Sequence, residues 1–176
     1  NEIKFSIHDE ETPADSMMLQ AASGTSGKID QNGIAILELG DGLEEVKLRV
    51  TPLENQTGDA SIVLSLGDGF TTVTKTITIH INNLNDAPVV KEDTVEFDED
   101  TPSVDISIAT LLSNDTDIEG NVLSFVEILT QPSFGTVTED GETLRYEPPA
   151  NFDGETSFTY SVSDGMVTSI ATCKLI

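Results

Sequence analysis

The residues best suited to chemistry are gathered in positions 114–121, which read Asn-Asp-Thr-Asp-Ile-Glu-Gly-Asn. Carboxylate and amide oxygens recur there at alternate positions, and Ca²⁺ takes about six to eight hard oxygen ligands of this kind. Asp115 and Asp117 are separated by a single residue, so one turn can direct both carboxylates at the same ion. The stretch therefore predicts a calcium site.

The acidic stretch has three alternative interpretations. An EF-hand is excluded because the twelfth loop position, counted from Asp115, is Val126 where a bidentate Glu is needed. A pair of carboxylates also serves glycosidases, but solvated acidic turns are far commoner than catalytic dyads. The sequence contains no Gly-x-Ser-x-Gly, His-Glu-x-x-His or phosphate-binding glycine loop, so we expect no enzyme. A solvated acidic turn stays open as the alternative to the calcium site.

The net charge of the chain bears on which classes of partner it can bind. Among 176 residues, 32 are Asp or Glu and 8 are Lys or Arg, which gives a net charge of -24. Phosphate would repel such a chain, so we expect neither nucleic acid nor an anionic membrane surface as a partner. No apolar run approaches the roughly 18 residues of a membrane span, and no membrane insertion is expected. Divalent cations would relieve the self-repulsion.

Few other side chains suggest chemistry. Cys173 is the only cysteine, so no disulfide can form within the chain, and we expect it to be a small buried hydrophobe. His8 and His80 lack partners at zinc-binding spacing, and His80 alternates with isoleucines as a surface strand residue would. The sequence opens on Asn1 without a secretion signal, which leads us to expect a piece of a longer protein.

Short strands must position these residues. Residues 60–66, 70–81 and 156–162 are rich in Val, Ile, Thr and aromatic residues, alternate in polarity and are bounded by Gly, Asp, Asn or Pro. Only residues 109–112 suggest a helical turn. The pattern predicts an all-β chain built of β-sandwiches.

An internal repeat in the sequence indicates how many domains the chain contains. Residues 65–69 resemble residues 161–165, with Asp164 lying 96 residues after Asp68, and residues 51–58 resemble residues 147–154. We therefore predict two sandwich domains, residues 1–85 and 86–176. The strand at residues 2–7 resembles residues 103–108, so the first repeat begins almost at that strand. We expect it to lack an N-terminal edge strand, or to receive that strand from elsewhere.

The second repeat resembles a bacterial cadherin-like domain of the kind strung together in large RTX-type adhesins and biofilm proteins. The resemblance rests on residues 85–88 (Asn-Asp-Ala-Pro), 97–101, 111–117, 151–154 (Asn-Phe-Asp-Gly) and 160–165, which span the repeat from end to end. The first repeat resembles the family through residues 9–16 and 67–69.

The resemblance implies calcium at domain junctions, held by the linker, by an Asp-x-Asp loop and by a late aspartate. The ligands that it implies here are Asn83, Asn85, Asp86, Asp115, Asp117, Asn121 and Asp164. The preceding domain would add an acidic loop residue, either Glu54 or Asp59. Asp9, Glu11 and Asp68 would form the equivalent set of the first repeat.

The function implied by the resemblance is that of calcium-rigidified extender repeats in an adhesin, located outside the cell or on a bacterial surface, with neighbouring repeats as partners. Two alternatives stay open, a calcium-dependent module that binds carbohydrate or protein and an accessory domain of a secreted hydrolase. Sugar platforms generally need exposed aromatic rings. This chain has no Trp, two Tyr and seven Phe, and we expect most of the Phe side chains in the core.

Overall fold

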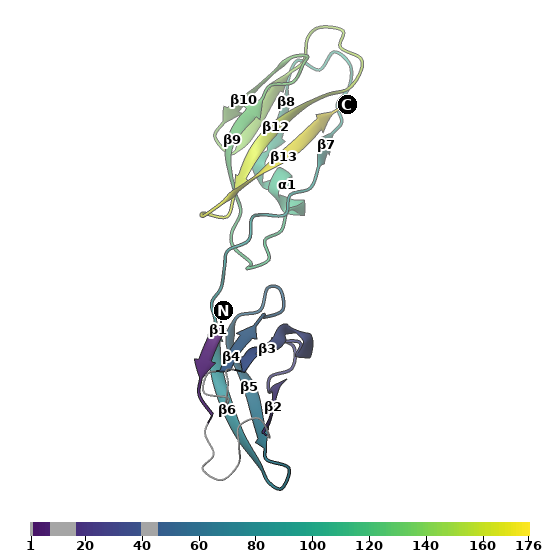
Figure 1. Ribbon diagram of the computed structural model, residues 1–176. Helices are drawn as coiled ribbons and strands as arrows, with labels where there is room; N and C mark the ends of the chain where they lie inside the picture. The colour runs from purple at the N-terminus through teal and green to yellow at the C-terminus, as the bar shows by residue number, and fades with distance from the viewer. Residues whose placement is uncertain (1, 8–16, 40–45) are drawn as a thin grey trace. The chain divides into compact units, whose positions relative to one another are not determined.

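The computed structural model describes residues 2–7, 17–39 and 46–176. The chain divides into two compact units, Asn1–Leu84 and Asn85–Ile176, each described by itself below. Nearly all regular structure in both units is β-strand, which confirms the predicted all-β class (Figure 1). No helix in the described ranges is long and apolar enough to cross a membrane.

The described part of the first unit forms two three-stranded antiparallel sheets, ordered β1-β4-β3 and β2-β5-β6. Its strands are β1 (Glu2–Phe5), β2 (Met18–Ser23), β3 (Ile34–Leu39), β4 (Val46–Val50), β5 (Gly58–Gly67) and β6 (Thr72–Ile81). The long β5–β6 hairpin confirms the strands predicted at residues 60–66 and 70–81.

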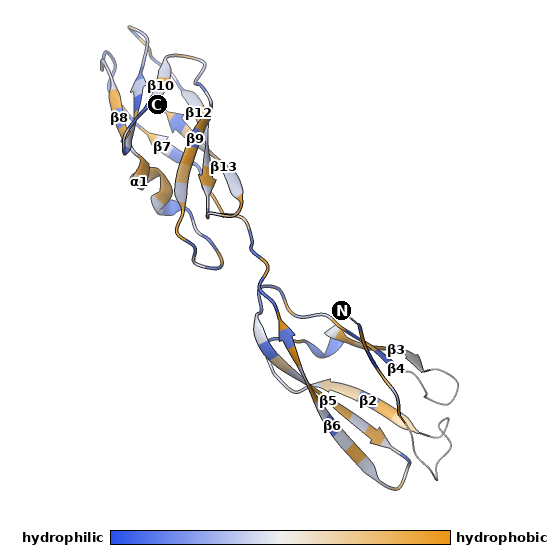
Figure 2. Cartoon of the chain, turned by 90° about the vertical axis from the view of Figure 1, so that its left-hand side faces the viewer, coloured by the Kyte–Doolittle hydropathy of each residue, from blue (hydrophilic) through white to orange (hydrophobic). Residues whose placement is uncertain are grey.

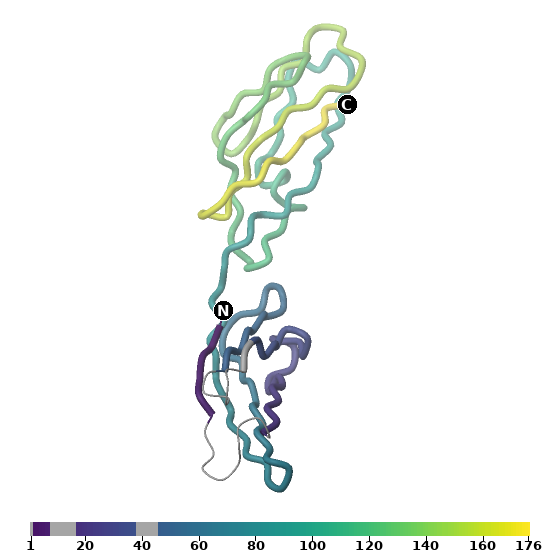
Figure 3. The backbone as a smooth tube through the Cα atoms, in the orientation of Figure 1, coloured from purple at the N-terminus to yellow at the C-terminus, as the bar shows by residue number. Residues whose placement is uncertain are grey.

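The second unit has the same plan and one strand more than the described part of the first unit. Its elements are β7 (Asp93–Val95), β8 (Val104–Ser107), α1 (Ile108–Leu111), a 3-10 turn (Leu112–Asn114), β9 (Ser124–Thr130), β10 (Thr136–Asp140), β11 (Thr143–Glu147), β12 (Thr156–Ser163) and β13 (Thr168–Leu175). The sheets are ordered β10-β11-β8 and β7-β13-β12-β9. Strand β7 runs parallel to β13, and Figure 3 traces the two side by side.

The two units share the same strand register. Ile62 lies opposite Ile77 in the β5–β6 hairpin, and Phe158 lies opposite Cys173 in the β12–β13 hairpin. Both partners are displaced by the same 96 residues that separate Asp68 from Asp164, so the repeat predicted from the sequence extends to the pairing of individual residues. Strands β1 to β6 correspond in order to β8 to β13, and the described part of the first unit contains no counterpart of β7.

Each unit has its own core between its two sheets, because apolar residues alternate with polar ones along the strands (Figure 2). In the second unit the largest side chains without exposed surface are Tyr146, Tyr160 and Phe158. Cys173 is fully buried, as predicted, and burial raises the pKa of its thiol to about 12, so the thiol is inert.

Two phenylalanine side chains are more exposed than predicted, whereas His80 is exposed as predicted. Phe70, at the tip of the β5–β6 hairpin, is 96% exposed, and Phe134 is 53% exposed, so these two phenylalanines do not belong to the core. His80 is exposed on β6, as predicted, and its Nδ1 lies 2.7 Å from the Asp59 carboxylate. His8 falls outside the described residues.

Candidate calcium site

Backbone hydrogen bonds join the first residues of the second unit to the acidic loop at residues 114–121. The amide of Val89 donates to the carbonyl of Thr116 over 2.7 Å, and the amide of Thr116 donates back over 3.0 Å. This isolated bridge holds the segment after Pro88 against the residue between Asp115 and Asp117. The chain thereby brings the two predicted ligand sources, linker and Asp-x-Asp loop, to one end of the second unit.

Each aspartate of the loop uses one carboxylate oxygen to fix the local backbone. Asp115, only 9% exposed, accepts a hydrogen bond from the amide of Lys91 at 2.8 Å through Oδ1. Asp117 accepts from the amides of Glu119 and Asn121, both at 3.0 Å, also through Oδ1. The carboxylate of Asp117 thus closes the turn of its own loop, and both side chains are held in one orientation.

The glycine of the loop is required by the backbone. The amide of Gly120 donates to the carbonyl of Asp117 at 3.2 Å, and Gly120 has a φ of 76°. Such a positive φ costs little for glycine and is unfavourable for most other residues. Gly120 therefore lets the chain turn back so that Asn121 can reach Asp117.

The second oxygens of the two aspartates have no partner. Asp115 Oδ2 and Asp117 Oδ2 are buried and make no hydrogen bond to the described part of the chain. A buried acceptor left in this state costs roughly 1–3 kcal/mol, and more if it is charged. A divalent cation is a suitable partner for a buried carboxylate oxygen of this kind, so in the chemistry of their oxygens the residues present fit calcium.

Asn85 joins the linker to the late aspartate. Its Nδ2 donates to Asp164 Oδ2 at 2.7 Å, and its Oδ1 accepts from Asn121 Nδ2 at 3.1 Å. The other oxygen of Asp164 accepts from the amides of Met166 and Val167, both at 2.7 Å. The hydrogen bond from Asn85, together with these amides, holds the pKa of Asp164 below its usual range. Asp164 is therefore an ionised carboxylate at neutral pH, although it is only 8% exposed.

The carboxylate of Glu119 also lies beside the linker residues of the candidate site. Glu119 Oε2 accepts from the amide of Asp86 at 3.3 Å, so this glutamate reaches the linker directly. Glu119 is not among the ligands predicted from the sequence, although it lies inside the acidic stretch. Its position one residue before the turn glycine was the available signal.

The predicted ligands therefore fall into groups. Asn85, Asn121 and Asp164 touch through their side chains, Asp117 joins them through the backbone of Asn121, and Asp86 joins through Glu119. The described ranges nevertheless hold no group of three His, Cys, Asp or Glu side chains close enough to bind a metal. The amides of Asn85 and Asn121 lie among the acidic side chains, where the NH₂ group of Asn85 meets the negative charge of Asp164.

The remaining predicted ligands are not in this group. Asn83 and Glu54 belong to the first unit. In the first repeat, Asp9 and Glu11 lie outside the described residues. Asp68 accepts from the amides of Phe70 and Thr71 at 2.8 and 2.6 Å, and these hydrogen bonds lower its pKa. Asp68 thus adopts the same turn as Asp164.

Comparison with known proteins finds a family model that matches the second unit. Residues 84–175, just over half of the chain, match the family model described as "Cadherin-like domain". No curated protein matches the chain. Among solved structures, human protocadherin-24 EC1-2 is similar with a TM-score of 0.48 and 13% identity over 96% of this chain and 85% of that one.

Two further similar structures are larger proteins. An endo-fucoidan hydrolase of glycoside hydrolase family 107 aligns with 89% of this chain at 20% identity and a TM-score of 0.34. The chain spans 23% of that hydrolase's length. Domains 4–9 of the surface layer protein SbsC align with 100% of this chain and 28% of theirs, at 12% identity and a TM-score of 0.32.

Proposed function

The chain belongs to the family of cadherin-like domains, and from this premise we propose that it is a calcium-rigidified extender segment of a bacterial surface or secreted adhesin. The observation that carries the proposal is the pair of buried, unpartnered carboxylate oxygens on Asp115 and Asp117, beside the linker between the two units. The single cysteine cannot form a disulfide within the chain, and a bound cation is another means by which a chain can be stiffened.

Calcium would supply positive charge, and the chain supplies the ligands. Asp115 and Asp117 offer the free oxygens, and Asp164 is already ionised and held in place by backbone amides. Rotation of the Asn85 and Asn121 amides would turn their oxygens toward the cation in place of their NH₂ groups. Asp86 and Glu119 are next in reach through their mutual contact.

The mechanism is thermodynamic linkage between binding and linker order. An ion that binds only the ordered arrangement of linker and loop stabilises that arrangement by mass action. The Val89–Thr116 bridge transmits the constraint, because it ties the linker to the loop that carries Asp115 and Asp117. A row of repeats stiffened in this way would hold a terminal binding domain away from the cell.

Replacement of Asp117 by Asn tests the assignment. The amide oxygen of Asn can still accept from Glu119 and Asn121, so the turn is kept while the charged ligand is lost. We expect calcium affinity, measured by calorimetry from a starting dissociation constant near 10⁻⁴–10⁻³ M, to fall by about tenfold or more.

The matched control is Asp153→Asn, which removes the same charge from an exposed position in the loop between β11 and β12. That variant should bind calcium like the parent protein. Equal affinities of the Asp117→Asn variant and the parent would show that the Asp-x-Asp loop is not the calcium site.

A further inference from the structure

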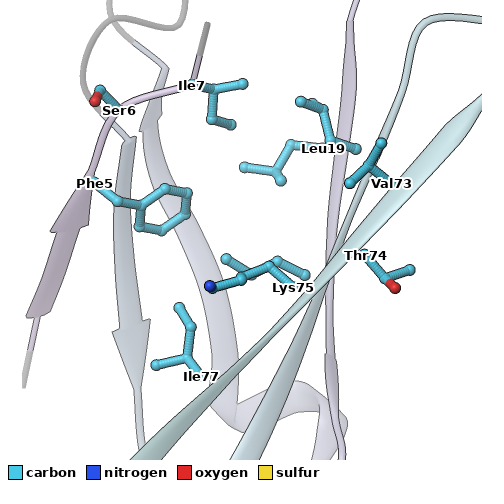
Figure 4. A pocket seen from close by; sticks show the side chains of 10 residues that line it. Phe5, Ser6, Ile7, Leu19, Val73, Thr74, Lys75 and Ile77 are labelled. Atoms are coloured by element: carbon cyan, nitrogen blue, oxygen red, sulfur yellow. The ribbon is translucent and has the colours of Figure 1, made fainter.

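The outer face of the β2-β5-β6 sheet in the first unit carries almost no charge. Apolar residues of these strands face the core at alternate positions, so the residues between them face outwards. Figure 4 shows this division on β6, where Lys75 points towards Phe5 of β1 and Thr74 lies on the other side of the strand. The outward residues of the described strands are Met18, Gln20 and Ala22 on β2, Asp59, Ser61, Val63, Ser65 and Gly67 on β5, and Thr72, Thr74, Thr76, Thr78 and His80 on β6. Only Asp59 and His80, which pair with each other at one end, have ionisable side chains.

This lack of charge contrasts with the rest of the chain, in which 32 of 176 residues are Asp or Glu. In the second unit, Ser161 of β12 lies opposite Glu127 of β9. Its equivalent in the first unit, Ser65, lies 96 residues earlier and faces Gln20 of β2. The first unit thus has a neutral amide where the second has a carboxylate. Because the middle of this face has no side chain that could pair with an ionic group, it suits an uncharged ligand.

Two adjoining hollows lie on this face. The first has a volume of about 260 Å³, and its lining includes Met18, Gln20, Ser65, Phe70 and Thr72. The second has a volume of about 390 Å³, and its lining includes Gln20, Ala22, Gln31, Val63 and Ser65. Gln20 and Ser65 line both, so we treat the two hollows as one shallow trough. Strand β2, which contributes to both, has six residues and is therefore about 20 Å long.

Two amides and a hydroxyl supply hydrogen-bonding groups to the trough. Gln31 is fixed against β2, because its Nε2 donates to the Ala21 carbonyl at 2.8 Å and its Oε1 accepts from the Ser23 amide at 3.2 Å. A second N–H and a second lone pair of this amide are left for a ligand. Gln20 is exposed, and the Ser65 side chain lies beside it in the middle of the trough.

An exposed aromatic ring stands at one end of the trough. Phe70 is 96% exposed, and Met18 beside it in the same hollow is 68% exposed. The backbone under the ring is held by Asp68, whose Oδ1 accepts from the amides of Phe70 and Thr71. A ring presented in this way offers a flat apolar surface. A sugar ring has C–H groups on its faces and hydroxyl groups at its rim, so it matches an aromatic ring that is followed by amides and hydroxyls.

We propose that the trough from Phe70 to Gln31 binds an extended, uncharged oligosaccharide that lies along β2. One sugar ring stacks on Phe70, and hydroxyl groups of the following sugars hydrogen-bond with the amides of Gln20 and Gln31 and with Ser65. The site lies within the first unit and uses none of the proposed calcium ligands. It therefore adds a binding activity to the extender role without depending on it.

The test uses the full 176-residue chain with chelator present, so that its outcome is independent of the calcium proposal. The probes are cellohexaose and β-1,4-linked mannohexaose, two uncharged hexasaccharides with extended backbones. Hexagalacturonate is the acidic control of the same length. We expect saturable one-to-one binding of at least one probe in calorimetry, slower amide exchange at residues 18–22 and 63–72, and no binding of the acidic control.

Variants of the protein locate the site. Phe70→Ala removes the stacking surface and should weaken binding of the probe about tenfold or more, whereas Phe70→Tyr keeps a ring and should bind like the parent. Gln20→Glu introduces the carboxylate found in the second unit and should weaken binding severalfold. The matched control is Phe134→Ala, which removes an exposed ring from the second unit and should leave binding unchanged. The proposal is overturned if neither probe binds, if the acidic control binds equally well, or if either Phe70→Ala or Gln20→Glu binds like the parent.

Discussion

The half-buried carboxylate of Asp93 is held by two side chains. The Tyr160 hydroxyl donates to its Oδ2 at 2.6 Å, and Asn114 Nδ2 donates to its Oδ1 at 3.0 Å. Burial raises the pKa of Asp93, the two hydrogen bonds oppose this rise, and the nearby charge of Asp115 adds to it. The ionised Asp93 side chain therefore lowers the folding stability of the second unit.

Replacement of Asp93 by Asn should stabilise the second unit at neutral pH. The Asn oxygen can accept from Tyr160, and a rotated Asn114 amide can offer its unpartnered Oδ1 to the new NH₂ group. A carboxylate with a raised folded pKa costs stability above that pKa, and the cost disappears below the unfolded value of 3.8. Thermal melts with chelator should therefore show a melting temperature a few degrees higher near pH 7 and no gain near pH 3. An unchanged or larger gain at the lower pH would contradict this account.

At the scale of single elements, the turn before β10 depends on one glycine. Gly135 has a φ of 79°, and a methyl group there would collide with the Glu147 carbonyl and the ring of Tyr146. That ring is fully buried, and its hydroxyl donates to the carbonyl of Phe134 at 3.0 Å, so it cannot move aside.

Gly135→Ala should destabilise the second unit by more than about 2 kcal/mol in urea unfolding, since it combines backbone strain with the collision. Gly141→Ala separates the two causes. Gly141 also has a positive φ, 66°, but no atom lies near its missing side chain. Its replacement should cost only about 1 kcal/mol. Equal losses in the two variants would mean that the collision with Tyr146 has no effect.

The elements also show what the sequence could and could not predict. Strand alternation predicted β5, β6 and β12, and residues 109–112 suggested the helical turn now seen as α1, because these depend on local pattern. The contact between Asn85 and Asp164 joins residues 79 positions apart, and the family resemblance was needed to suggest it. The Asp93–Tyr160 pair was missed, since an acidic residue in a strand pattern carries no sign of its partner. Glu119 was missed although its place before the turn glycine was a usable signal.

At the scale of the whole molecule, we propose that the linker around Asn85 is a hinge controlled by calcium. Without the ion, the clustered carboxylates would repel one another, and a bound calcium ion would neutralise part of their charge. Small-angle scattering in chelator and then in roughly millimolar calcium should give a better-defined and longer maximum dimension with the ion. The Asp117→Asn variant serves as control and should respond less. Identical profiles for the parent chain in both conditions would remove the basis for a stiff extender.

The parallel pairing of β7 with β13 has a mechanical consequence. These are the first and last strands of the second unit, so tension applied at its two ends pulls them in opposite directions along their length. Their hydrogen bonds are then loaded together in shear and cannot open one at a time. In the described part of the first unit, the outermost strands β1 and β6 lie in different sheets, and no such clamp connects them. Single-molecule stretching should therefore show two rupture events, with the second unit yielding at the higher force. Rupture of both units at the same force would show that β7 bears no load.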